Sequence, residues 1–154
     1  MAVDILVRPV EPGDIEHVAA HMRQADLDEI AATGVPDPVE ALTRSIKDSV
    51  LCWTGCADGE PGCIFGVVPV SMLCGIGSPW LLGTELIPKN AGAFIRHSTP
   101  YIHGMLREFP HLFNFVDVRN RKAIAWLKRS GFVLSEATPY GPFGLPFHPF
   151  EMRA

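Results

Sequence analysis

Histidine is the metal-binding residue type whose spacing is easiest to judge in this sequence, which contains six of them. His17 and His21 are four residues apart on a predicted helix, so they would share one helix face. No Asp or Glu is assured nearby as a third ligand, and a polar helix face is the expected role. His97 and His103 are six residues apart and do not share a face. The sequence therefore predicts no metal site.

Cysteine chemistry is the second option that spacing can test. The four cysteines are Cys52, Cys56, Cys63 and Cys74. Their spacing does not match the Cys-x-x-Cys pairs of structural zinc sites. All four lie in apolar, strand-like sequence, which favours buried free thiols in a reducing compartment. The sequence also contains no Ser/His/Asp elbow, P-loop or dinucleotide-binding fingerprint.

The charge distribution argues against a nucleic-acid partner. The net charge is −4, and no block of Lys and Arg is longer than two residues. The largest basic cluster is expected to be a solvated helix face; it comprises Arg119, Arg121, Lys122, Lys128 and Arg129. No run of 18 apolar residues occurs, so we expect no membrane span, and the N-terminus does not resemble a secretory signal. We expect a cytoplasmic protein.

The elements that would position functional side chains follow from hydrophobic periodicity. With 154 residues, 47% of them apolar, the chain can form one domain with a substantial core. Helices are expected in two short pieces between 14 and 34, then at 38–48, from 90 with an interruption at Pro100, and from 121 to 130. Strands are expected at 3–8, 50–54, 63–72, 80–87 and 112–118, and from 132.

Helix caps and turns support these assignments. Asp14, Asp37 and Asn120 each precede a helical pattern and are predicted N-caps, while Gly131 is a predicted helix stop. Asp58-Gly59 predicts a tight hairpin turn. The resulting order, βαααβββαβαβ with an optional last strand, predicts an α/β fold in which a mixed sheet carries helices on both faces.

The C-terminal segment, residues 138–154, differs in composition from the domain predicted over residues 1–137. Between 138 and 149, proline and glycine recur among phenylalanines, which predicts a loop. The last residues are expected to add at most an edge strand. This segment would either cover the sheet edge or dock on a partner through its exposed aromatic residues.

This order of elements resembles the GNAT (GCN5-related N-acetyltransferase) superfamily. The run from Asn120 to Phe132 resembles the late helix of that family, which ends in Gly-Phe. The hairpin at Asp58-Gly59 and the start of the chain, Val7-Arg8-Pro9 followed by Asp14-Ile15, resemble earlier parts of the same fold. Within the superfamily, the segments 26–30, 79–84 and 126–127 are most similar to small GNAT-like proteins of short-tailed bacteriophages, some of which are virion components or assembly proteins.

The resemblance implies an acetyl-CoA site, and it also shows where this chain departs from the family. Lys89, Asn90, Ala91, Gly92 and Ala93 stand where GNAT enzymes hold the cofactor diphosphate on free N–H groups, and Asn120 would lie near the CoA arm. Phe94 replaces a small residue of that loop, so its ring either obstructs the diphosphate or turns into the core. Asn90 would then simply cap a helix whose first core residue is Phe94.

The catalytic groups implied by the resemblance are incomplete. Glu85 stands where GNAT bases often lie, beside Thr84 as a hydrogen-bond donor, although a solvent-facing strand position also explains Glu85. Leu127 occupies the position of the usual tyrosine acid, and neither Tyr101 nor Tyr140 lies on that helix.

Two functional hypotheses therefore stand. The first is a phage-type GNAT-fold protein that acts in the virion or in assembly, through other phage proteins or self-association, with little acetyl transfer. The alternative is an acetyl-CoA-dependent N-acetyltransferase of unknown acceptor that needs no metal.

Overall fold

The computed structural model describes residues 2–154. Its elements follow in the order β1 (Ile5–Arg8), α1 (Asp14–Ala20), α2 (Gln24–Ala32), α3 (Pro38–Asp48), β2 (Leu51–Ala57), β3 (Glu60–Ser71), β4 (Ile76–Gly83), α4 (Leu86–Lys89), α5 (Ala91–Glu108), β5 (His111–Asp117), α6 (Arg121–Ser130), β6 (Val133–Leu134), β7 (Thr138–Tyr140) and β8 (Leu145–Arg153).

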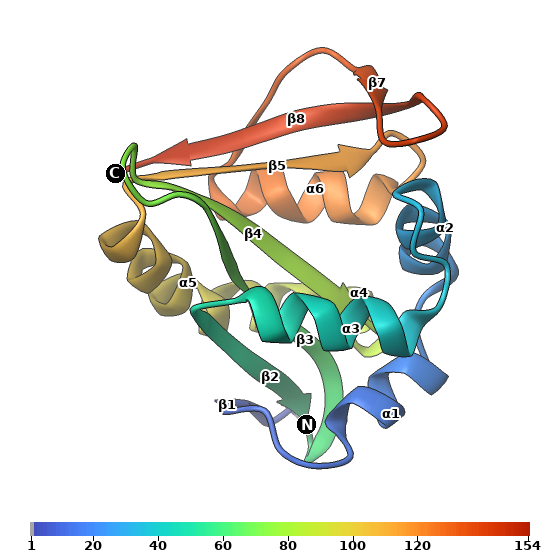
Figure 1. The fold of residues 1–154 in the computed structure, drawn as a ribbon. Helices are drawn as coiled ribbons and strands as arrows, with labels where there is room; N and C mark the ends of the chain where they lie inside the picture. Colours follow the sequence, from blue (N-terminus) through green and yellow to red (C-terminus); the bar gives the residue numbers. More distant parts are fainter. Residues whose placement is uncertain (1) are drawn as a thin grey trace.

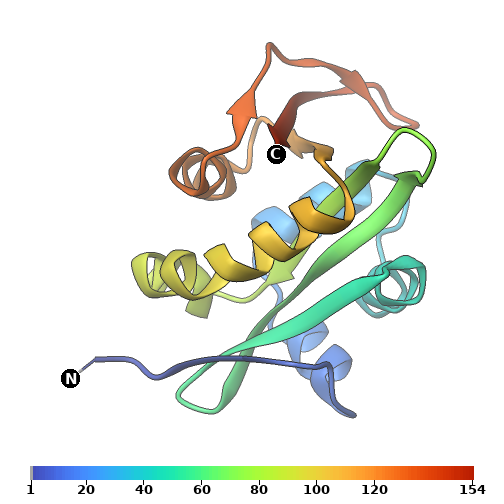
Figure 2. The same cartoon turned by 90° about the vertical axis from the view of Figure 1, so that its left-hand side faces the viewer.

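One mixed sheet organises the chain (Figure 1). Its strand order is β1-β2-β3-β4-β5-β8-β6, and β7 pairs with the start of β8. Every pairing is antiparallel except that of β4 with β5. Helices lie on both faces of the sheet, with α5 and α6 on one side and α3 on the other in Figure 2. The predicted fold class is confirmed.

Each face of the sheet has its own apolar core. Neighbouring strand residues point to opposite faces, so Phe65 packs under α5 and α6 while Ile64 packs under the first three helices. Phe109 and Leu112 are central to the first core, and Leu42 belongs to the second. The two cores hold β4 firmly from both sides, and the functional geometry described below depends on this strand.

The cap predictions are confirmed for two helices and wrong for a third. The Asp37 side chain accepts a hydrogen bond from the Val39 N–H, and the Asn120 side chain accepts one from the Ala123 N–H. Gly131 ends α6 with a φ of 103°. Asp14, in contrast, is the first residue of α1 and makes no cap bond. Its buried carboxylate instead accepts two hydrogen bonds from the Arg8 guanidinium.

Several predicted boundaries shift by a few residues, and two expectations next to the site are wrong. β4 ends at Gly83 rather than near residue 87, because α4 begins at Leu86. Pro100 lies inside α5 without interrupting the helix. A proline in this position removes one backbone donor. The hydroxyl groups of Ser98 and Thr99 both donate to the Ile95 carbonyl in the same turn, which adds local bonds beside that missing donor.

The loop predicted over residues 138–149 is largely wrong. β7 and β8 occupy most of that segment, and β8 lies between β5 and β6 rather than at an edge. Its prolines are tolerated because their missing N–H groups point past the ends of the neighbouring strands. The Pro146 carbonyl accepts from Val118, just beyond β5, and the Pro149 carbonyl accepts from Ser135, just beyond β6.

The cysteine prediction holds for part of the set. All four cysteines are free, and Cys56 and Cys63 are buried, but Cys74 is exposed in the turn between β3 and β4. Met72 and Leu73, which precede it in the turn, are also exposed, so the apolar sequence around Cys74 did not indicate burial. In residues 2–154, no helix is long and apolar enough to cross a membrane.

Candidate functional site

The sheet is split between β4 and β5. These strands pair only at Ile76 with His111 and at Gly77 with Leu112, and they then diverge. Pro79 explains part of the split, because its backbone faces β5 and has no N–H to donate. The Asn114 side chain replaces the missing hydrogen bonds between the two backbones. Its amide donates to the Pro79 carbonyl over 2.7 Å, and its oxygen accepts from the Phe115 N–H over 2.8 Å.

Two carboxylates from α2 bridge the open end of the split. Asp26 accepts a hydrogen bond from the Gly83 N–H at the end of β4, over 3.0 Å. Glu29 accepts one from the Asp117 N–H at the end of β5, over 2.7 Å. The Asn120 amide group donates to both carboxylates, over 3.2 and 3.1 Å. Helix α2 thus joins two strands that no longer pair with each other.

Arg23 is the cation nearest to these carboxylates. It is 7% exposed, and its guanidinium donates to Asp26 over 3.3 Å and to the Asn120 side-chain oxygen over 3.0 Å. Its backbone N–H also donates to the Gly83 carbonyl, which fixes the start of α2 against β4. One buried arginine therefore lies beside two carboxyl groups of α2, the buried Asp26 and the half-buried Glu29.

This imbalance changes the acidity of both carboxyl groups. Burial raises the pKa of Glu29 to about 7, and the nearby charge of Asp26 adds to the effect, although the Asp117 N–H opposes it. Burial also raises the pKa of Asp26, in spite of the opposing charge of Arg23. A carboxyl group with a pKa near 7 can accept and release a proton at neutral pH.

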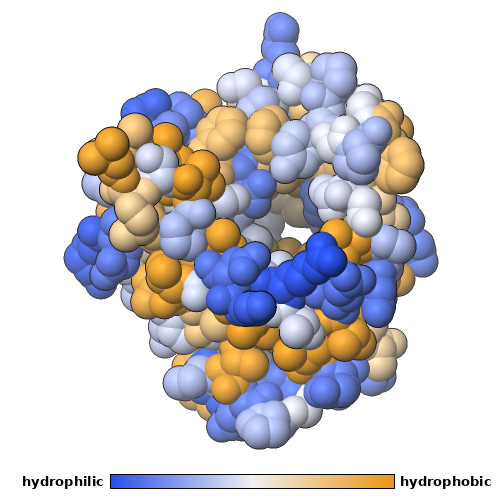
Figure 3. Space-filling model, in the orientation of Figure 1, coloured by the Kyte–Doolittle hydropathy of each residue, from blue (hydrophilic) through white to orange (hydrophobic). Residues whose placement is uncertain are grey.

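A cavity of about 270 Å³ occupies the split between the strands. Its walls come from both faces of the sheet. Ile30, Trp80 and Tyr140 line it on the side of α2, α3 and β7, whereas Met105 and Trp126 line it on the side of α5 and α6. Figure 3 shows the surface hollowed at the centre of the face that carries α2 and α3. Glu29 and Asp26 line the same cavity.

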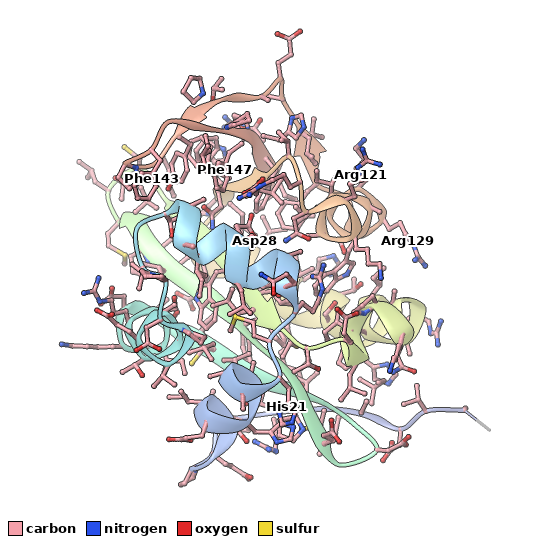
Figure 4. The ribbon with its side chains drawn as sticks, turned by 90° about the vertical axis from the view of Figure 1, so that its right-hand side faces the viewer. His21, Asp28, Arg121, Arg129, Phe143 and Phe147 are labelled. Carbon is pink, nitrogen blue, oxygen red and sulfur yellow. The ribbon has the colours of Figure 1, made fainter. Side chains whose placement is uncertain are left out.

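A second cavity of about 380 Å³ adjoins the first on the side of α5 and α6. The two cavities share Arg23, Ala123 and Trp126 as lining residues. Lys89, Lys122 and Arg129 bring positive charge to the second cavity, and Glu85 is the carboxylate on its rim. In Figure 4, the basic side chains Arg121 and Arg129 of α6 lie away from Phe143 and Phe147. The two phenylalanines are near the C-terminal end of α2.

The residues predicted to hold a diphosphate lie partly at this second cavity. Lys89 and Ala91 line it, and a Cβ added to Gly92 at the start of α5 would lie 3.6 and 3.7 Å from guanidinium nitrogens of Arg96 and Arg129. Ala93 packs against the core. Asn90 occupies the N-cap position of α5 but makes no cap bond; its amide donates to the Leu86 carbonyl instead.

Phe94 does not obstruct this loop. Its side chain is 3% exposed and packs against Gly55 of β2 and Gly62 of β3, whose missing side chains leave room for the ring. A Cβ added to Gly55 or Gly62 would lie 3.2 or 3.3 Å from ring carbons of Phe94. Of the two alternatives, the ring turned into the core is the one observed.

The two residues predicted to be catalytic, Thr84 and Glu85, differ in exposure. Thr84 is buried, and its hydroxyl oxygen accepts from the Leu86 N–H. Glu85 is exposed at the second cavity, outside the lining of the central one. Leu127 lines the central cavity at the position where a tyrosine would be expected. Beside it, the indole N–H of Trp126 is buried and has no hydrogen-bond partner within residues 2–154.

Sequence reasoning missed the residues that define the central cavity. Arg23, the N-cap of α2, and Asp26 and Glu29 within the helix are spaced by three residues, a spacing that places charged groups on one helix face. That signal was visible in the sequence, but such a face is normally solvated. Tyr140 was also missed, because β7 was expected to be loop.

The histidines form no metal site in the described part of the chain. The rings of His17 and His21 have centroids 4.5 Å apart, and His97 bonds to the Ala93 carbonyl of its own helix. Within residues 2–154, no group of three or more His, Cys, Asp or Glu side chains is arranged to hold a metal ion.

Comparisons with known proteins identify the fold. No family model matches the sequence, and no curated protein matches it either. Solved structures do match. An aminoglycoside N(6′)-acetyltransferase from Legionella pneumophila has a TM-score of 0.72 at 13% identity, over 99% of this chain and 94% of that one. A GNAT-family acetyltransferase from Streptococcus pneumoniae has a TM-score of 0.67 at 15% identity, over 98% and 100%. The chain has the GNAT fold.

A further matching structure contains bound ligands. The spermidine N-acetyltransferase from Vibrio cholerae, solved in complex with CoA and spermine, has a TM-score of 0.66 at 14% identity, over 97% of this chain and 95% of that one. At such identities the GNAT likeness covers the fold alone. The bacteriophage subtype stays a prediction, because none of these structures supports it.

Proposed function

We propose that this GNAT-fold chain is an acetyl-CoA-dependent N-acetyltransferase. The observation that carries the proposal is the cavity that passes through the sheet between β4 and β5. The second cavity, which is lined by Lys89, Lys122 and Arg129 and is called the basic recess below, adjoins it on one side. Glu29, a carboxyl group with a pKa of about 7, lies in the lining of the passage itself. Such a passage lets two reactants enter from opposite faces and meet beside a proton acceptor.

The basic recess fits the phosphate end of CoA. Lys89, Lys122 and Arg129 line it, and the N-terminus of the 18-residue helix α5 lies beside it. Helix N-termini attract phosphate through their free N–H groups and the helix dipole. Arg96 lies near Gly92 at the same helix start. Lys122, Arg129 and Arg96 add their positive charge to that of Lys89, the cation of the sequence-predicted loop.

The narrower passage fits an extended arm that ends in a thioester. Trp126, shared by both cavities, presents a buried N–H that needs an acceptor. On β4, the Thr84 N–H bonds to Gly62 in β3, and strand groups alternate in direction, so the N–H groups of Leu81 and Gly83 point toward β5. Asp26 takes the Gly83 N–H, which leaves the Leu81 N–H as the donor for a carbonyl oxygen in the split.

The chain supplies a base for the acceptor amine. When bound, acetyl-CoA contributes an activated acetyl group. The ionised form of Glu29, about half of the population at neutral pH, can take the proton that an ammonium must lose before its nitrogen attacks the thioester. The second proton, lost when the amide bond forms and the C–S bond breaks, passes to solvent. Trp126 can donate a hydrogen bond toward a departing thiolate but cannot give up its proton. The proton for that thiolate therefore comes from solvent, since Leu127 has none to offer.

Glu29 replaces Glu85 as our candidate base. Glu85 is exposed at the rim of the basic recess, where a carboxylate would face phosphate groups. Glu29 lines the passage itself. A role in a virion or in assembly stays a prediction; the cavity and its charges favour the enzyme.

Calorimetric titration with acetyl-CoA tests the proposal. We expect micromolar to submicromolar binding, and we expect Arg129→Glu to weaken it by at least about tenfold because the phosphates lose a cation and meet an anion. Lys47→Glu, which reverses an exposed charge on α3, is the matched control and should leave binding unchanged. A release assay for free CoA thiol with a panel of amines then measures transfer. Absence of acetyl-CoA binding to the intact chain would refute the proposal.

A further inference from the structure

The half of the passage that opens toward α2 and β7 is aromatic. Trp80, Phe115, Tyr140 and Phe147 all line it. The rings of Phe115 and Tyr140 are stacked with centroids 4.0 Å apart, and those of Tyr140 and Phe147 are 5.1 Å apart. The Trp80 indole N–H donates to the Ser49 hydroxyl, so this ring is held in place and its polar group is already satisfied.

Charge in the passage is confined to its end beside α2. The charged residues that line the cavity are Arg23, Asp26 and Glu29, and they bond to one another or to Asn120. The other polar residues of the lining, such as Thr33, Ser45 and Asn114, carry no charge. A single ammonium group can be placed near Glu29, but a second or third ammonium on the same molecule would be buried without a counter-charge.

The entrance on this side is narrowed by the hairpin between β7 and β8. Pro142 packs against Gly34 at the end of α2, and a Cβ added to Gly34 would lie 3.2 Å from the Pro142 ring. Gly141 lies equally close to the Ala32 carbonyl, with 2.9 Å between that oxygen and a Cβ added to the glycine. Figure 1 shows this hairpin reaching the end of α2. A folded protein or a wide oligosaccharide would not pass this contact.

We propose that the acceptor is a small primary monoamine that carries a flat apolar group, such as an arylalkylamine. This inference rests on the proposed function and names its substrate class. Its ammonium would lie toward Glu29 and its ring between Tyr140 and Trp80. The spermidine and aminoglycoside named for the structural relatives are polycations, and this passage lacks the carboxylates that they would require.

Direct binding of two amines to the CoA-saturated chain provides the test. CoA without its acetyl group prevents turnover, so calorimetry reports binding alone. We expect phenethylamine to bind at least about tenfold more tightly than spermidine, because its ring is buried while the extra charges of spermidine are not matched. Steady-state kcat/KM with acetyl-CoA should rank the amines in the same order. Tighter binding of spermidine would overturn the inference.

Three variants separate the ring of Tyr140 from its hydroxyl and from general changes in the hairpin. Tyr140→Ala should weaken phenethylamine binding by about tenfold, whereas Tyr140→Phe should stay within about twofold. Phe143→Ala, which removes a ring 67% exposed in the same hairpin, should have no effect. Thermal unfolding confirms that each variant is folded. Unchanged phenethylamine binding in folded Tyr140→Ala would also overturn the inference.

Failure of this inference differs from failure of the proposed function. If CoA binds and phenethylamine does not, the substrate class is wrong and the enzymatic proposal stands. If phenethylamine binds at this site and CoA does not, the aromatic site stands and the transferase proposal fails.

Discussion

Removal of the Glu29 carboxyl charge should change how the stability of the protein depends on pH. Burial raises the pKa of this carboxyl from its ordinary value of 4.5 to about 7. The folded state then binds a proton more tightly than the unfolded state. Between pH 4.5 and about pH 7, Glu29 is protonated in the folded state and ionised in the unfolded state. Its contribution to the free energy of unfolding therefore falls as the pH rises.

The size of this effect follows from the two pKa values. Relative to about pH 8, where Glu29 is ionised in both states, protonation at about pH 5.5 adds roughly 2 kcal/mol to the free energy of unfolding. For a domain of this length that corresponds to roughly 4–8 °C in Tm. The gain should approach its limit of about 3 kcal/mol only below the unfolded pKa.

Urea unfolding of Glu29→Gln and of the wild type, at about pH 5.5 and about pH 8, measures this contribution. Glutamine has one oxygen, so either the Asp117 N–H or the Asn120 amide loses its acceptor, at a cost of about 1–3 kcal/mol at both pH values. The difference between the two pH values should nevertheless shrink by roughly 2 kcal/mol in the variant. Asp28→Asn removes a charge from the same helix, where the carboxylate bonds only to exposed Gln24, and is the control.

Two outcomes would contradict this reasoning. If Glu29→Gln and the wild type lose stability in parallel between those pH values, the carboxyl is not perturbed by burial. If Asp28→Asn shows the same change as Glu29→Gln, the effect belongs to the net charge of α2 rather than to the buried site. In an active enzyme the same proton should limit catalysis, so that kcat/KM rises with pH through about 7.

Two further predictions concern other parts of the fold. Burial would raise the pKa of Asp14, but hydrogen bonds from Arg8, the Glu11 N–H and Thr54 outweigh it and lower the pKa to about 2. Asp14 therefore stabilises the fold above about pH 4. In denaturant unfolding, Asp14→Asn should lower the free energy of unfolding by about 2 kcal/mol at neutral pH and reduce the loss of stability between about pH 4 and 2. An acid transition equal to that of the wild type would contradict this. At the closed end of the split, a Cβ on Gly77 would lie 2.7 Å from atoms of Phe109 and Val67, so Gly77→Ala should cost about 1–3 kcal/mol in the same assay. Gly104→Ala in α5, which meets only the end of Arg107 at 3.6 Å, should be neutral or stabilising, and an equal loss in both variants would contradict the packing argument.

The elements that the sequence predicted well are those fixed by local rules. Asp37 and Asn120 cap helices because a short polar side chain can reach a backbone N–H two or three residues on, whatever the rest of the fold does. Gly131 ends α6 because only a glycine takes its backbone conformation without strain. The mixed sheet with helices on both faces followed from the order of these elements along the chain and from short connections. Local chemistry was therefore sufficient for most of the fold.

The parts that could not be predicted depend on tertiary contacts. β8 was hidden because the positions of Pro146 and Pro149 are harmless only where β5 and β6 have already ended. Asp14 was taken for a cap, since nothing local shows that the Arg8 guanidinium lies beside it. Glu29 could not be distinguished from a solvated residue, because its burial results from a contact with β5, which is 88 residues away in the chain.

Asn120 shows how one residue can be predicted correctly and still be only half explained. Its side-chain oxygen caps α6, as local rules require, and also accepts from Arg23. Its amide nitrogen joins Asp26 to Glu29, which no local rule indicates. A helix cap alone would not require a residue that is 1% exposed. The second role places Asn120 in the wall of the passage.

The buried network at the end of the split is costly for a purely structural device. Two carboxyl groups with one arginine leave the interior short of positive charge, and apolar residues of similar volume would often hold such a junction with greater stability. The network also keeps β4 and β5 apart at the place where the cavity crosses the sheet. Groups with perturbed acidity concentrate at functional sites because catalysis needs them there. Under the proposed function, that cost in stability holds Glu29 ready to take a proton in the passage.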